Sequence, residues 1–265
     1  TLSSKATSIS NTYNSTVSGI AGIAGKMVIE DSNVKDCNIT GGGYALGGIA
    51  AVACSEATIK DVTAKNINIV DIGMNVSPNQ YIPYPLRSIS GIMAVATNFT
   101  GENITVDNVN VTSHSVTIGG ALATSSTLKK FEKVSVNEFN VTNDPITNGA
   151  NGSVAGLIGD VYTVSADSIK DCSVTNSSMI TKCHNASGFI GTLNSDTTIE
   201  NAIVDNVVVR NTNETNTGLI GDIGGLVSYT AGKLYINNSN VKNSTLEEKF
   251  TDGVNTAGRH IGGFG

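Results

Sequence analysis

The feature that most constrains the fold is an internal repeat. A short glycine-apolar block recurs along the chain, and ten to thirteen residues after its glycine a second block of eleven residues begins. The second block aligns without gaps in seven copies, a pattern typical of repeat architectures. The glycine blocks are SGIAG (18–22), GGIAA (47–51), SGIMA (90–94), GGALA (119–123), AGLIG (155–159), SGFIG (187–191), GGLVS (224–228) and GGFG (262–265), and the eleven-residue blocks begin at Ile29, Ile59, Gly101, Phe131, Ile169, Ile199 and Ile236.

Positions 4, 6, 9 and 11 of the eleven-residue block form mostly apolar columns, as Ile104, Val106, Val109 and Val111 do in the third copy. A spacing of two puts each pair on one face of a strand, and the slip of one residue between positions 6 and 9 indicates a corner. Position 8 is Asp, Asn or Glu in every copy and position 3 is rich in Asp and Asn. Asx residues suit tight bends, and stacked amides form ladders.

These columns predict an all-β protein, a parallel β-solenoid (β-helix) of about seven coils with three short strands per coil. We expect a single array over 1–265, with a partial coil at 1–17, seven repeats at 18–261 and the start of an eighth at 262–265. The longer connections at 70–90, 142–155, 210–224 and 247–262 all follow position 11. Insertions are therefore expected at one corner, where a solenoid usually carries its function.

The glycine blocks AGLIG, TGLIG (217–221) and SGFIG resemble the G-L-x-G signature of GLUG-type repeats, whereas GGALA and SGIMA lack the final glycine. The resemblance covers 17–265. It implies a solenoid segment of a large secreted or surface protein of the adhesin type, and it implies no catalytic residue.

Charge and composition exclude some partners. The formal net charge is -6 with a pI near 5.0, which argues against nucleic acid as a partner, and no window is apolar enough for a membrane span in this segment.

Thirteen N-x-S/T sequons occur, whereas chance pairing of 30 Asn with 56 Ser and Thr would give roughly six, so we expect an extracellular or cell-surface glycoprotein. Strand ends that read N-x-T would produce several of them for structural reasons. The candidate N-glycosylation sites are Asn14, Asn38, Asn75, Asn98, Asn103, Asn110, Asn140, Asn151, Asn176, Asn185, Asn213, Asn237 and Asn243.

No arrangement of residues points to catalysis, and we expect neither an enzyme nor a cofactor or metal site. Asp31 and Asp61 share a corner position on neighbouring coils, but the next residues in that column are Asn103 and Lys133, so no acidic cluster grows there. The histidines lack a second histidine at ligand spacing. These histidines are His114, His184 and His260. Cys37 and Cys172 lie in inward columns, whereas Cys54 and Cys183 do not, which leaves open a disulfide that involves either of the latter.

The sequence therefore predicts an extracellular structural or adhesive module, a stalk or filament-forming rod with loops on one edge. The alternative is a carbohydrate-binding or carbohydrate-active β-helix, which a groove with acids and exposed aromatics would favour. The connection at 70–90 holds Tyr81, Tyr84 and Arg87, residue types enriched at binding hot spots, and is the candidate partner-binding loop. A second possibility is that it only covers a hydrophobic corner. The expected partner is a protein or glycan surface ligand, or another copy joined end to end.

Overall fold

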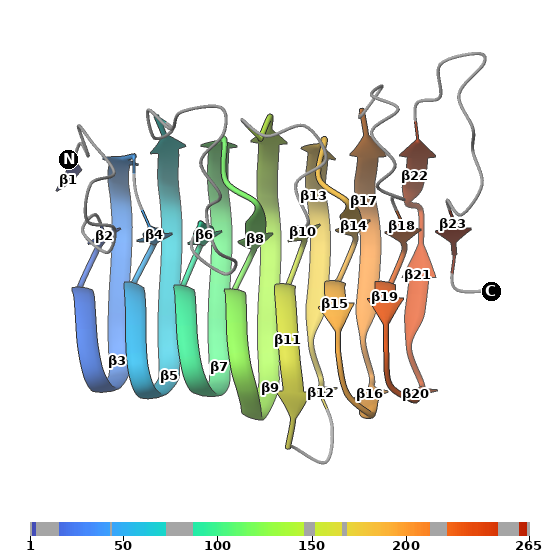
Figure 1. The fold of residues 1–265 in the computed structure, drawn as a ribbon, viewed down its shortest axis with the longest axis horizontal. Coiled ribbons are helices and arrows are strands. Elements are labelled where there is room, and N and C mark those ends of the chain that lie inside the picture. Colours follow the sequence, from blue (N-terminus) through green and yellow to red (C-terminus); the bar gives the residue numbers. More distant parts are fainter. Residues whose placement is uncertain are drawn as a thin grey trace, which may run out of the picture.

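The computed structural model describes residues 2–3, 16–42, 44–72, 87–145, 152–165, 169–212, 222–248 and 260–263. Within these ranges every regular element is a strand and every pairing is parallel. Figure 1 shows the strands stacked side by side along one axis in chain order. The predicted parallel β-solenoid is confirmed.

Each coil contributes to two sheets. The small sheet has the order β2-β4-β6-β8-β10-β14-β18-β23, and the large sheet contains the other strands. The bounds are β1 (Leu2–Ser3), β2 (Thr16–Ser18), β3 (Ala21–Gly41), β4 (Ala45–Gly47), β5 (Ala50–Asp71), β6 (Ser88–Ser90), β7 (Met93–Ser113), β8 (Thr117–Gly119), β9 (Leu122–Asn143), β10 (Ser153–Ala155), β11 (Ile158–Val164), β12 (Ile169–Lys170), β13 (Ser173–Thr181), β14 (Asn185–Ser187), β15 (Ile190–Leu193), β16 (Thr197–Glu200), β17 (Ile203–Asn211), β18 (Asp222–Gly224), β19 (Val227–Thr230), β20 (Leu234–Asn237), β21 (Asn240–Lys242), β22 (Thr245–Glu248) and β23 (His260–Gly262).

The division into three short strands per coil is wrong for the first four coils. There, β3, β5, β7 and β9 are continuous strands of 21 or 22 residues that bend through two corners, because the inter-coil hydrogen bonds persist around the bends. From the fifth coil onward the same path breaks into shorter strands, starting with β11, β12 and β13.

Residues at the same position of successive blocks pair with one another in the large sheet, so the gap-free alignment of the seven blocks predicts its register. Ile29 pairs with Ile59, and Val106 pairs with Val136, which pairs with Val174 in turn. Positions 4, 6, 9 and 11 of the middle coils point inward, with at most 2% of each side chain exposed in the third copy. In the first and last coils most of these positions are only partly buried, as at Val34 and Val241, because the described residues place no further coil against them.

At two corners of every coil, one residue adopts the left-handed backbone conformation. Among the described residues, all fourteen non-glycine residues with positive φ lie at positions 3 and 8 of the seven blocks, with φ between 47° and 56°. The corner expected at position 8 is therefore confirmed, and position 3 is a second one. Asn and Asp tolerate this conformation best, yet the fourth coil has Lys133 and Glu138 there, so stacking between neighbouring coils imposes the backbone on less suited residues.

Side-chain amides link the corners along the axis. Asn66 donates from Nδ2 to Asp36 Oδ1 (2.8 Å), and Asn108 donates to Asn66 (3.0 Å). At the other corner Asn201 donates to Asp171 (2.7 Å). In these bonds the donor belongs to the later coil, so each run begins with an aspartate that only accepts. The predicted ladders are thus confirmed at both corners.

In the first six coils the glycine of the repeat block is required by close packing between coils. A Cβ on Gly19 or on Gly91 would lie 2.5 Å from the carbonyl oxygen of the corresponding glycine one coil on, Gly48 or Gly120. On the inner side the same Cβ would meet the position-6 valine, which is 3.0 Å away for Gly91 and Val106. Only glycine lets two backbones approach so closely at this bend.

The third corner, where the large sheet passes to the small sheet, carries a buried polar column. Asp71, Ser113, Asn143 and Thr181 follow one another in it and are each at most 3% exposed. Asp71 Oδ2 accepts from the hydroxyls of Ser113 (3.3 Å) and Ser115 (2.8 Å), and Asn143 Nδ2 donates to Thr181 Oγ1 (3.2 Å). These bonds join the polar side chains at the corner where the connections leave the solenoid, although Asn143 Oδ1 is buried and has no hydrogen-bond partner among the described residues.

Candidate functional site

A crease runs along the outside of the solenoid, where the small sheet meets the first segment of the large-sheet strands. One wall is a column of small-sheet residues and the other a column that follows the glycine blocks. The two columns touch: Ser88 Oγ lies 3.1 Å from Thr124 Oγ1. We define the crease by Ala45, Ser88, Thr117, Ser153, Asn185 and Asp222 on the first wall, and by Val52, Val95, Thr124, Asp160, Thr192 and Tyr229 on the second.

The crease changes character along the axis. At its N-terminal end Ala45, Val52 and Val95 belong to a small apolar cluster separate from the main core. From the fourth coil onward the same positions are Thr124, Asp160 and Thr192, so the crease becomes polar while these three residues stay more than nine-tenths buried. Buried polar side chains along a surface crease are suited to binding a ligand.

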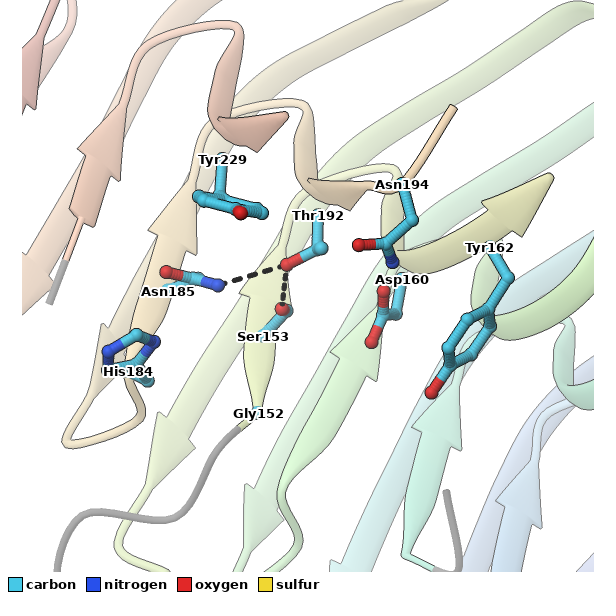
Figure 2. A pocket seen from close by; sticks show the side chains of 9 residues that line it. All are labelled: Gly152, Ser153, Asp160, Tyr162, His184, Asn185, Thr192, Asn194 and Tyr229. Carbon is cyan, nitrogen blue, oxygen red and sulfur yellow. Dashed lines mark hydrogen bonds between the residues drawn. The ribbon is translucent and has the colours of Figure 1, made fainter. Parts of the chain in front are cut away.

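A cavity of about 440 Å³ lies in this polar part of the crease. Figure 2 shows the side chains around it, with the polar groups between Tyr229 on one side and Tyr162 on the other. Small-molecule sites in proteins have volumes in this range and few polar groups. The described residues that line the cavity are Gly152, Ser153, Asp160, Tyr162, His184, Asn185, Thr192, Asn194 and Tyr229.

Asp160, in β11, is the one carboxyl among these lining residues. It is 3% exposed, and the backbone amide of Val161 donates a hydrogen bond to it. Its Oδ1 atom has no hydrogen-bond partner among the residues that the structure describes. Burial raises the pKa of Asp160 from 3.8 to about 7, and the Val161 bond lowers this pKa by a smaller amount.

Three polar side chains form a connected group beside Asp160. Asn185 Nδ2 donates to Thr192 Oγ1 (3.0 Å), and the Ser153 hydroxyl lies 2.7 Å from the same Thr192 oxygen. The Oδ1 atom of Asn185 is buried and, within the described part of the chain, makes no hydrogen bond. The cavity therefore holds two buried acceptor atoms that need a donor.

The rim of the cavity is aromatic. Tyr162 is 38% exposed and Tyr229 is 44% exposed. Burial, and to a lesser degree the charge of Asp160, raises the pKa of Tyr162 to about 12. His184 is half-buried, and desolvation lowers its pKa, which leaves it neutral at pH 7.

The predicted partner-binding loop is corrected in part. Tyr81 and Tyr84 lie outside the described residues, whereas Arg87 is only 2% exposed. Arg87 therefore does not present its guanidinium to a partner; it lies against the solenoid, where desolvation lowers its pKa and the nearby charge of Asp71 opposes that shift. Its Nε and Nη2 atoms are buried and make no hydrogen bond to the described residues.

One candidate glycosylation site is excluded. Asn185 is 8% exposed and donates to Thr192 within the crease, so a glycan on its amide is incompatible with this fold. The described sequons at Asn38, Asn98, Asn103, Asn110, Asn140, Asn176, Asn237 and Asn243 are half-exposed or exposed, and those at Asn14, Asn75, Asn151 and Asn213 lie outside the described residues.

Several sequons follow from strand alternation. In N-I-T at Asn103 and N-V-T at Asn110 and Asn140, the middle residue fills an inward column and the flanking residues point outward. An outward Asn column with outward Thr beside it reads as a series of sequons whether or not a glycan is attached. The excess over chance therefore has a structural source as well as a functional one.

The other candidate residues from the sequence either bond to a neighbouring coil or lie apart from one another. Asp61 accepts a hydrogen bond from Asn103, and His260, the first residue of β23, contacts Asp222 through Nδ1 (2.8 Å). In the described ranges no three His, Cys, Asp or Glu side chains gather as a metal site, and no helix could cross a membrane. All four cysteines are free: Cys37 is partly buried, Cys54 exposed, and Cys172 and Cys183 buried.

No family model, no curated protein and no solved structure matches the chain. The resemblance to GLUG-type repeats thus depends on the glycine blocks alone.

Sequence reasoning did not find the crease. The residues of its second wall come directly after the last small residue of each glycine block, as Asp160 follows Gly159 and Thr192 follows Gly191. A column that changes from Ile and Val in the early repeats to Thr and Asp in the later ones was the available signal.

Proposed function

We propose that the chain is an extracellular structural module of adhesive type, a rod that presents variable connections along one edge. The observation that carries the proposal is where the coil length varies. Between the large and the small sheet the gap runs from Gly41 to Ala45 in one coil and from Asp71 to Ser88 in another. The opposite link, from the small sheet back to the large one, is always two residues, such as 48–49 and 91–92.

The remaining irregularities are small. Register shifts occur between Ala24 and Lys26, between Ala53 and Glu56, and between Phe99 and Thr100, so the rest of the coil does not hold its length throughout. These shifts leave every following block in register. A rigid stack with one permissive corner is suited to displaying sequence that differs from coil to coil, since loops tolerate insertion and the scaffold does not.

The partner we propose is a protein or glycan on a surface, with end-to-end self-association as a second possibility. The partly buried columns of the first and last coils support the latter, because apolar side chains such as Ile20 (49% exposed) and Ile23 (57% exposed) would gain cover from another coil. The extracellular location is supported by the exposed sequons. It is tested by the intact mass of the protein from its natural source, which should fall on glycosidase treatment; an unchanged mass contradicts it.

The display function is tested on the connection at 70–90. Tyr81→Ala combined with Tyr84→Ala should abolish attachment of chain-coated beads to cell or matrix surfaces and leave thermal unfolding of the solenoid nearly unchanged. The matched control is Tyr235→Ala, an exposed tyrosine on β20. If the double variant lowers the melting temperature and its folded fraction still attaches, the connection is a structural brace and the proposal is wrong for this segment.

A carbohydrate-binding role is a second candidate, favoured by the cavity in the crease. Glycoside hydrolysis requires two carboxyl groups across the scissile bond, and the described lining supplies one, Asp160. Of the two carbohydrate-related roles, we therefore retain carbohydrate binding and not hydrolysis.

A further inference from the structure

We infer that the cavity in the crease is a binding site for one neutral saccharide ring, held by Asp160, Asn185 and the tyrosines of the rim. This inference rests on the carbohydrate-binding candidate above and is independent of the displayed connections. Its starting point is the pair of buried acceptor atoms, Oδ1 of Asp160 and Oδ1 of Asn185. A buried acceptor without a donor is costly, so such atoms call for a ligand or water that donates.

The orientation of Asn185 defines what the ligand must supply. Its Nδ2 is committed to Thr192 Oγ1, which Ser153 holds from the other side. The amide oxygen is therefore the end left for a ligand, and it accepts only. The ionised carboxylate of Asp160 likewise accepts only. Both groups select a molecule with hydroxyl or N–H donors.

The positions of the two acceptors favour several donors over one. Asp160 belongs to β11 of the fifth coil, and Asn185 belongs to β14 at the start of the sixth. Neighbouring coils are about 4.8 Å apart, so a ligand that donates to both acceptors must reach across two coils. A sugar ring carries hydroxyls on several carbons and can donate to both.

The rim suits the apolar face of such a ring. Tyr229 shares a column with Asp160 and Thr192, and Tyr162 follows Asp160 by two residues, so two phenol rings flank the acceptors. Tyrosine offers a large, rigid contact surface at low conformational cost. The C–H face of a pyranose packs against it while the hydroxyls reach Asp160 and Asn185.

Charge excludes acidic sugars. The described lining residues include no lysine or arginine, and Asp222 is close enough to His184 to influence its pKa. A uronate or sialate would place its carboxylate near Asp160 with no cation to compensate. The site therefore takes a neutral ring.

The experiment is saturation-transfer NMR on the full chain at pH 8, where the Asp160 carboxylate is ionised. The probes are the methyl glycosides of glucose, galactose and mannose, with glucuronate and glucosamine as charged counterparts. At least one neutral glycoside should show transfer, and glucuronate none. Asp160→Asn, which exchanges the free acceptor for an N–H donor, and Tyr229→Ala should each weaken binding at least tenfold. Tyr235→Ala, outside the crease, should leave the Kd within twofold.

Three results overturn the inference: no transfer from any neutral glycoside, transfer that survives both crease variants, or transfer from glucosamine alone, which would assign a cation site. Circular dichroism of each variant verifies its fold. None of these results bears on bead attachment by the Tyr81 and Tyr84 double variant, so failure here and failure of the display function are distinguishable.

Discussion

The buried carboxyl in the crease makes the stability of the protein depend on pH. Burial raises the pKa of Asp160 from 3.8 to about 7, so the folded chain holds this proton more tightly than the unfolded chain. Folding therefore takes up a proton between these two pKa values. The contribution of Asp160 to the free energy of unfolding is largest below pH 4, decreases as pH rises, and levels off above pH 7.

The size of the effect follows from the two pKa values. A difference of roughly three units corresponds to about 4 kcal/mol in total, at 1.36 kcal/mol per unit, and about 2.5 kcal/mol of it falls between pH 5 and pH 8. Asp160→Asn removes the titration and keeps the shape. The stability of the variant relative to the natural protein should therefore rise by about 2.5 kcal/mol over this interval.

Urea denaturation at pH 5, 6, 7 and 8 measures this difference. Comparing the two proteins at each pH cancels the contribution of His184, whose lowered pKa acts in the opposite direction. A difference that stays constant from pH 5 to pH 8 would mean that Asp160 has an ordinary pKa and that it is not desolvated in the crease.

The remaining predictions concern packing and thiols. Gly120→Ala should destabilise the solenoid by several kcal/mol, since its Cβ would overlap a carbonyl of the next coil, whereas Gly25→Ala, with open space around it, should be tolerated; equal melting temperatures would contradict the close approach. In native protein a thiol reagent should modify Cys54 rapidly and spare Cys172 and Cys183, because both are buried and their thiol pKa values are raised to about 12 and about 11; equal labelling rates before unfolding would show that the core opens.

The fold could be predicted because its signals are periodic. Each inward column repeats seven times, and a one-residue slip would turn every valine outward, so alignment and register coincide. Continuity of the strands could not be predicted in the same way. A left-handed corner residue resembles a break in the sequence, yet Asp61 and Asn66 lie within the uninterrupted β5.

The candidate site was less accessible to sequence reasoning because it depends on where two sheets meet. Asp160 follows a glycine block like any outward residue, and only the packing of β10 and β14 against β11 and β15 buries it. Arg87 shows the reverse case. It belongs to a long connection rich in proline and tyrosine, which suggests an exposed loop, yet its side chain is buried beside Asp71 at the third corner.

Stacking of consecutive coils in register is the claim on which both the rod and the crease depend, and cross-linking of engineered cysteines tests it directly. Asn38 and Asn68 pair across neighbouring coils on the outer face, and Asn68 pairs with Asn110 one coil further on. In a Cys54→Ser background, Asn38→Cys with Asn68→Cys should form a disulfide rapidly under mild oxidation, since coils about 4.8 Å apart match disulfide geometry. Asn38→Cys with Asn110→Cys, two coils apart, should not. Equal cross-linking of the two pairs, or of neither, would contradict the solenoid register.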